Sequence, residues 1–102
     1  MRVVTRKITN AWRKGERLTV GNTRTDGYNI WLHGNCIVRT TDMGAIQIST
    51  AGWNTSTTRE RLNGFLHAAG LPYTGVFNRR GELYFGTHDN RTPWDGEWMT
   101  VI

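Results

Sequence analysis

Apolar residues near the start of the chain recur with the spacing of one helix face. They follow the i, i+4, i+7, i+8 pattern at Val4, Ile8, Ala11 and Trp12. Thr5 is placed to cap the start of this helix and Gly15 to end it. Because about ten residues are rarely helical alone, the apolar face must pack on the rest of the protein. Residues 4–15 are therefore expected to form a docked helix.

From Leu18 to Thr50 the apolar positions recur every second residue, which is typical of strands. Asp26-Gly27 favours a type I′ hairpin turn, and Gly34-Asn35 suits a type II′ turn. The second turn would pair Leu32 with Ile37, Trp31 with Val38 and His33 with Cys36. Ile46 and Ile48 would share one face of the last strand. The pattern predicts an antiparallel meander of about four strands over residues 18–50.

A second amphipathic helix is expected after the bend at Gly52-Trp53. Thr57 and Glu60 match a capping box, in which the hydroxyl and the carboxylate each accept a backbone N–H. The helical spacing continues through Leu62, Phe65, Leu66 and Ala69, and Gly70 and Pro72 end it. We expect residues 74–86 to form a hairpin through Arg80-Gly81, residues 89–98 a turn-rich loop, and residues 97–102 a last strand.

This order of elements predicts one α+β domain over residues 1–102. Two short helices would pack on an antiparallel β-meander of about four strands plus a C-terminal hairpin or three strands. A chain of 102 residues with 37% hydrophobic residues suits one globular domain. No apolar run reaches the length of a membrane span and the start lacks a signal-peptide core. With a single Cys, these features favour an intracellular protein without membrane contact.

Positive charge is concentrated at the N-terminus. Residues 1–17 contain six basic residues and one acidic residue, a net charge of +5 that equals the charge of the whole chain. The remaining basic and acidic residues balance. Eleven of the thirteen basic residues are Arg, whose planar guanidinium suits phosphate and carboxylate. The segment is either a solvated helix face or a surface for nucleic acid or an acidic partner.

The candidate catalytic and metal-binding residues are few. His33 and Cys36 flank a tight turn, but zinc requires three or four ligands. A second candidate cluster, His88 and Asp89 with Asp95 and Glu97, could serve a metal-dependent nuclease, but Asp in turns commonly binds its own backbone. We predict no catalytic residue, no metal and no cofactor, and therefore no enzyme.

The five tryptophans carry more information. Trp12 and Trp31 occupy positions expected to be buried. Trp53 and Trp94 lie in loops, where an indole either covers the core or anchors a partner. Trp together with Arg is typical of nucleic-acid stacking surfaces and of protein–protein hot spots alike.

Two further arginines, Arg59 and Arg61, stand out at the second helix. If Thr57 is the N-cap, they occupy helical positions N2 and N4, where the helix dipole disfavours cations. An anion or acidic partner would offset that preference. The predicted binding residues are Arg6, Lys7, Arg13, Lys14, Arg17, Trp53, Arg59, Arg61 and Trp94.

Four segments in order, GNTRTDG, WLHGN, STAGWNTSTTRERLNG and WDGEW, resemble a family of small accessory proteins encoded by tailed bacteriophages. The resemblance covers mainly residues 16–64 and carries over no active site. It implies a phage protein made in the bacterial host cytoplasm. Such proteins often bind host machinery or counter host defences.

Three functions remain open from the sequence. The first is non-enzymatic binding of DNA or RNA, or of a host nucleic-acid-processing complex. The second is inhibition of a host enzyme or anti-phage defence protein through Trp53, Trp94 and Tyr73. The third is a small metal-dependent nuclease or hydrolase. A homodimer formed through a sheet edge is compatible with each of them.

Overall fold

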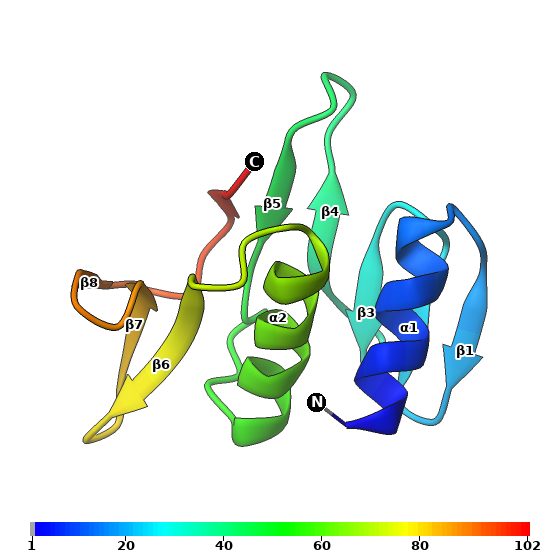
Figure 1. Ribbon diagram of the computed structural model, residues 1–102. Coiled ribbons are helices and arrows are strands. Elements are labelled where there is room, and N and C mark those ends of the chain that lie inside the picture. The colour runs from blue at the N-terminus through cyan, green and yellow to red at the C-terminus, as the bar shows by residue number, and fades with distance from the viewer. Residues whose placement is uncertain (1) are drawn as a thin grey trace.

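The computed structural model describes residues 2–102 and confirms the α+β class (Figure 1). Within these residues there are two helices, α1 (Val3–Arg13) and α2 (Ser56–Ala68). The first half of the chain also forms β1 (Leu18–Val20), β2 (Thr23–Thr25), β3 (Ile30–Leu32), β4 (Asn35–Thr40) and β5 (Ile46–Ile48). The strands after α2 are β6 (Gly75–Arg79), β7 (Glu82–Gly86), β8 (Arg91–Pro93) and β9 (Met99–Thr100).

The strands form two antiparallel sheets. The large sheet has the order β1-β2-β3-β4-β5-β9, and the small sheet has the order β6-β7-β8. The meander over residues 18–48 therefore has five strands rather than about four. The predicted hairpin through Arg80-Gly81 is confirmed, whereas residues 91–93, expected in a loop, pair with β7. The chain then returns to the large sheet, where β9 pairs with β5.

Both helices lie on one side of the large sheet (Figure 1). Helix α1 packs on β1, β2 and α2, and α2 also contacts β4 and β6. The predicted apolar face of α1 is confirmed, because Ile8 and Ala11 are buried and Trp12 is half-buried. Trp12 meets Phe65 edge-on, with ring centroids 4.8 Å apart. The core thus lies between the helices and the inward side of the large sheet.

The expected helix caps are partly wrong. Thr5 is a buried residue inside α1, and the N-cap position is Arg2, without a side-chain cap. Gly15 does end α1, because its φ of +70° lets the Glu16 N–H reach the Ala11 carbonyl at 2.9 Å. At α2 the N-cap is Thr55 rather than Thr57, and its hydroxyl accepts the Thr58 N–H at 3.1 Å.

The two hairpin turns in the meander also differ from the prediction. His33 (φ +50°) and Gly34 (φ +80°) are the central residues between β3 and β4, which is the type I′ pattern. The pairs are consequently Leu32 with Asn35 and Trp31 with Cys36. Asp26-Gly27 is not a two-residue turn but part of a four-residue loop, in which the Asp26 carboxylate accepts the N–H groups of Tyr28 and Asn29.

Candidate nucleic-acid interface

The side of the large sheet facing away from the helices carries polar and aromatic residues. Residues paired across neighbouring strands share a face, and the register forms two rows, Thr19–Arg24–Trp31–Cys36 and Arg39–Gln47–Thr100. A bulge in β4, where the consecutive residues Ile37 and Val38 are both buried, puts Cys36 and Arg39 on the same face and so joins the two rows. We call this set the open face. The alternate residues, such as Thr25, Ile30 and Val38, are buried beneath the helices. None of the strand residues that form the open face is acidic.

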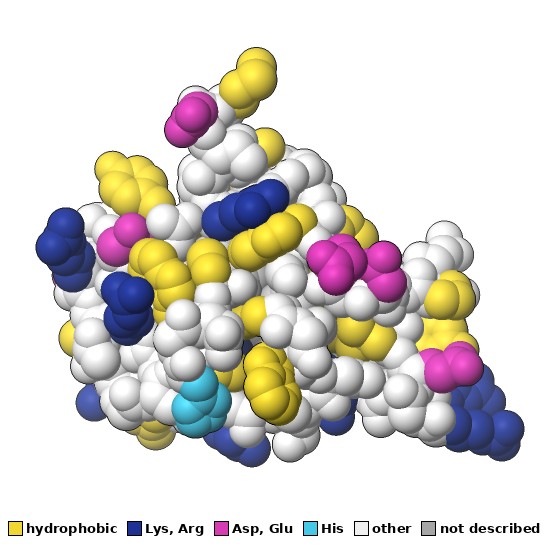
Figure 2. Space-filling model, turned by 180° about the vertical axis from the view of Figure 1, so that it is seen from behind, with side chains coloured by type: hydrophobic (Ala, Val, Ile, Leu, Met, Phe, Trp, Pro, Cys, Tyr) yellow, Lys and Arg dark blue, Asp and Glu magenta, His cyan; other side chains and the backbone are white. Residues whose placement is uncertain are grey.

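Two arginines on the open face lie on tryptophan rings. The Arg24 guanidinium is 4.0 Å from the Trp31 ring centroid, and that of Arg39 is 4.0 Å from the Trp98 ring centroid. Arg39 Nε also donates to Gln47 Oε1 at 2.8 Å. Figure 2 shows this side of the protein, with Lys or Arg side chains resting on hydrophobic ones. A stacked guanidinium uses its plane, and N–H donors at its edge remain available for anions.

Arg17 lies near the first of these stacks. A hollow of about 570 Å³ at the β1–β2 side of the open face is lined by Arg17, Arg24 and Trp31, among other residues. Asp26 also lines the hollow. Burial raises the pKa of Asp26, but hydrogen bonds from the Asn29 and Tyr28 amides outweigh burial and lower it. The predicted basic residue Arg17 thus lies beside a stack that includes Trp31.

Trp31 was expected in the core and is instead half-buried on the open face. The period-two pattern could have placed Trp31 on the same face as Arg24, since the two residues lie opposite each other across the loop at residues 26–29. Arg24, Arg39 and Trp98 were not among the predicted binding residues. The remaining predicted basic residues of the N-terminal segment, Arg6, Lys7, Arg13 and Lys14, are all exposed.

The prediction that Arg61 binds a partner at the surface is wrong. Its side chain is only 5% exposed and lies inside the protein, where it donates to Thr23 at 2.9 Å, Thr5 at 3.0 Å and Asn22 at 3.3 Å. With Thr55 as N-cap, Arg59 and Arg61 lie at N4 and N6, beyond the first turn, so the expected conflict with the helix dipole does not arise. Arg61 is a structural residue, and no external anion is needed to explain it.

Glu60 is the acidic partner of Arg61, with Oε1 2.5 Å from Arg61 Nη1. It also accepts hydrogen bonds from the Thr5 hydroxyl and the Arg2 N–H. Burial alone would raise the pKa of Glu60, but these hydrogen bonds and the charge of Arg61 lower it below its ordinary value. The carboxylate predicted to cap α2 therefore joins α2 to α1.

Trp53 and Arg59 lie at the start of α2. Trp53 is 59% exposed, and Arg59 Nη1 donates to the Asn54 carbonyl at 3.2 Å. Trp53 borders a cavity of about 390 Å³, which we call the Trp53 cavity; it is lined by Leu32, His33, Asn35, Ile37, Thr50, Trp53, Thr55, Thr57 and Thr58. Trp94 differs from Trp53, because it is half-buried against Phe85 and its indole N–H donates to the Glu97 carbonyl at 3.0 Å.

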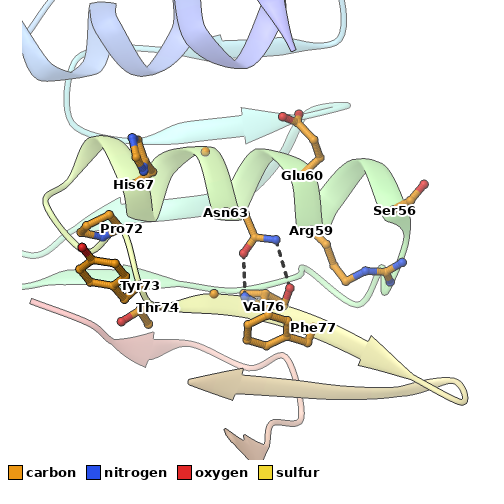
Figure 3. A pocket seen from close by; sticks show the side chains of 12 residues that line it. Ser56, Arg59, Glu60, Asn63, His67, Pro72, Tyr73, Thr74, Val76 and Phe77 are labelled. Atoms are coloured by element: carbon orange, nitrogen blue, oxygen red, sulfur yellow. Dashed lines mark hydrogen bonds between the residues drawn. The ribbon is translucent and has the colours of Figure 1, made fainter. Parts of the chain in front are cut away.

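A third concave surface, of about 750 Å³, runs between α2 and β6 (Figure 3). Asn63 spans it, because its side chain accepts the Val76 N–H at 2.7 Å and donates to the Val76 carbonyl at 3.1 Å. Arg59 lies toward one end of the groove and His67 with Tyr73 toward the other. Tyr73 is 85% exposed.

The candidate metal ligands are not brought together. Among residues 2–102, no three His, Cys, Asp or Glu side chains gather at one point. Asp95 instead accepts the Glu97 N–H at 2.9 Å, as a turn residue does. Burial raises the pKa of the Cys36 thiol, and its Sγ donates to the Val38 carbonyl.

In residues 2–102 there is no helix with the length and apolar character that a membrane crossing requires.

The fold and this surface define an α+β protein whose two helices cover one face of a six-stranded antiparallel sheet and leave the other face open. The chain belongs to the Kyanoviridae Gp96 protein family, whose model matches residues 1–100. It is thus a phage protein, which confirms that part of the resemblance seen in the sequence. No curated protein and no solved structure gives a significant match.

Proposed function

We propose that this phage protein binds single-stranded nucleic acid without modifying it, and that the open face is its binding surface. One observation carries the proposal: Arg17 and Arg24 lie with Trp31 in a single hollow of the open face. Bases of a single strand stack on aromatic side chains and equally on the planes of arginine guanidinium groups, such as those that cover Trp31 and Trp98, and arginine N–H groups also bind the neighbouring phosphates. Exposed single strands arise in the host's nucleic-acid-processing complexes, so the proposed place of action is the bacterial host cytoplasm.

The shape of the surface favours a single strand over a duplex. Reading a duplex requires an element that enters a groove, whereas the open face is a sheet surface whose Arg–Trp stacks recur at Trp31 and Trp98. A flexible strand can follow both stacks. The net charge of +5 supports attraction to a phosphate backbone.

Fluorescence anisotropy with labelled single-stranded DNA, single-stranded RNA and duplex DNA tests this function. We expect binding of single strands that weakens log-linearly with added salt, and weaker binding of the duplex. Arg24→Gln combined with Trp31→Leu should lower the affinity about tenfold or more. Arg80→Gln, in the exposed β6–β7 turn, is the matched control and should bind like the wild type. Absence of binding to any nucleic acid at low salt would overturn the proposal.

Inhibition of a host protein is the second candidate. It is favoured by Tyr73, which is 85% exposed beside the α2–β6 groove and distant in sequence from the open face. The test is a pull-down from host lysate with the wild type, Tyr73→Ala and the Arg24→Gln/Trp31→Leu variant. A stoichiometric partner that is lost only with Tyr73→Ala would support this candidate, and recovery of no such partner would count against it.

A further inference from the structure

The Trp53 cavity is bordered by an exposed indole whose backbone is fixed by a tight turn. Ala51 (φ +54°) and Gly52 (φ +85°) form a tight turn, and the Trp53 N–H donates to the Thr50 carbonyl at 3.0 Å. A non-glycine residue at positive φ is strained and persists only where its surroundings fix it. Here the Ser49 hydroxyl accepts the Ala51 N–H at 3.0 Å.

A second segment fixes the same turn. The Gly96 carbonyl accepts both the Ser49 hydroxyl and the Thr50 N–H at 2.9 Å. Ser49 and Thr50 are themselves buried. Trp53 is therefore displayed by a rigid backbone although 59% of its surface remains in water.

The lining of the cavity indicates the chemistry of its ligand. Leu32 and Ile37 are buried and provide an apolar floor. The other lining residues include four threonines, His33 and Asn35, of which His33 and Asn35 are exposed, and no acidic residue is among them. A volume of about 390 Å³ lies within the range of pockets for small organic molecules. These features suit a flat heteroaromatic ring with hydrogen-bonding groups along its edge.

We propose that the Trp53 cavity receives one unstacked nucleobase, whose ring stacks on Trp53 and whose polar edge meets the polar residues of the lining. This inference rests on the proposed function, because it extends the path of the bound strand beyond the open face. Trp31 is on the open face, whereas the next residue, Leu32, points to the opposite face of the sheet and lines the cavity. The proposed path of the strand therefore runs from one face to the other around the β3–β4 turn, where exposed His33 also lines the cavity. Arg59 lines the neighbouring α2–β6 groove, and its Nη1 donates to the carbonyl of Asn54, the residue after Trp53. Its positive charge would meet the phosphate that adjoins the bound base.

The test measures the affinity of DNA and RNA oligonucleotides, intact or with one abasic position, for the wild type and for Trp53→Ala. We expect Trp53→Ala to lower the affinity for intact oligonucleotides about tenfold. One abasic position should lower the affinity of the wild type by a similar factor. Trp53→Phe should keep most of the affinity. Tyr73→Ala removes an even more exposed aromatic side chain outside this cavity and should bind like the wild type. Unchanged thermal unfolding verifies that each variant is folded.

Free adenosine separates this inference from the proposed function. It has no phosphate, so perturbation of the Asn35 and Thr57 amide resonances by adenosine, absent in Trp53→Ala, would report the cavity alone. If no oligonucleotide binds but adenosine does, the proposed function fails and the base site stands. If oligonucleotides bind the wild type and Trp53→Ala equally, and adenosine perturbs neither residue, the base site is overturned while the function stands.

Discussion

Glu60 and Arg61 are neighbours in sequence and act together inside the protein. Arg61 connects α2 to β2 through Thr23, and both residues reach Thr5 of α1. A buried guanidinium without its carboxylate is strongly destabilising. This pair is therefore a structural joint between the helices and the large sheet.

The first prediction concerns Glu60→Gln. The lowered pKa means that ionised Glu60 contributes stability at pH values above its ordinary 4.5, and that this contribution is lost as the pH falls below 4.5 toward the folded-state pKa. At neutral pH the variant should lose about 2 kcal/mol of unfolding free energy. Urea unfolding between about pH 6 and pH 3 should show the difference from the wild type shrinking as the pH falls. The exposed Glu16→Gln is the control, and a pH-independent difference would contradict the assignment.

The second prediction concerns Asn63→Ala. This change leaves the N–H and carbonyl of buried Val76 without their partners in α2. The free energy of unfolding should fall by about 2 kcal/mol. Exposed Asn10→Ala in α1 should change it by less than about 0.5 kcal/mol. Equal urea midpoints for Asn63→Ala and Asn10→Ala would show that the hydrogen bonds between Asn63 and Val76 do not contribute to stability.

At the start of α2 the sequence offers two threonines that could be the N-cap, and the prediction chose the wrong one. Thr55 and Thr57 are both suitable caps, and choosing Thr57 shifted Arg59 and Arg61 by two helical positions. That error turned a buried arginine into a predicted surface contact. The partners that bury Arg61, Thr5 and Thr23, are distant in sequence, so no local pattern could reveal them.

At the scale of elements, the end of α1 is packed closely against the β2–β3 loop. A Cβ on buried Gly27 would lie 2.5 Å from the backbone carbon of Gly15. Backbone atoms at that distance cannot move aside as the end of a side chain can. This contact fixes the end of α1 over the meander. Gly27 also follows Asp26, which lines the hollow that contains Arg17 and Arg24.

The third prediction compares Gly27→Ala with Gly21→Ala. Both glycines have positive φ, but nothing lies within 4 Å of a Cβ at Gly21. Gly21→Ala should therefore cost only the conformational strain, about 1 kcal/mol, whereas Gly27→Ala should cost about 2 kcal/mol more because of the clash. Thermal unfolding of both variants measures the difference. Equal losses would mean that the close approach of α1 to the loop does not contribute.

Element types were predicted more reliably than strand register. The helices, the meander and the β6–β7 hairpin follow from period and turn signals. The β3–β4 register was wrong because His33, rather than a glycine, adopts positive φ at the first central position of the turn. Trp31 consequently changed partner from Val38 to Cys36. The return of β9 to β5 depends on pairing across some fifty residues, as in Ile48 with Met99, and a short two-residue strand has no distinctive pattern.

For the whole molecule, charge extends from the end of α1 toward the open face. Arg13 and Lys14 are exposed at the end of α1, and Arg17 follows them into the hollow with Arg24. The sequence identified this segment by composition. The open face could not be predicted in the same way, because only the register of the strands shows that its arginines and tryptophans share one surface.

The fourth prediction uses this continuity. Under the proposed function, Arg13→Gln with Lys14→Gln removes two phosphate contacts. The negative slope of log affinity against log salt for single strands should therefore become less steep, by about 1.4. Arg79→Gln with Arg80→Gln changes the same number of charges at the β6–β7 turn and should leave the slope unchanged. Equal slopes for both double variants, measured by anisotropy titration, would show that the α1 charges do not contact the strand.

The pairing of β9 with β5 has a consequence for self-association. Two residue pairs, Gln47 with Thr100 and Ile48 with Met99, define their register, and backbone hydrogen bonds join Ile46 to Val101 and Ile102 beyond them. Detachment of so short a strand would uncover the edge of β5, including its N–H and carbonyl groups. The corresponding β9 of a second molecule could then take its place, with the same contacts now joining two chains. Strand exchange of this kind would give a reciprocal dimer without a new interface.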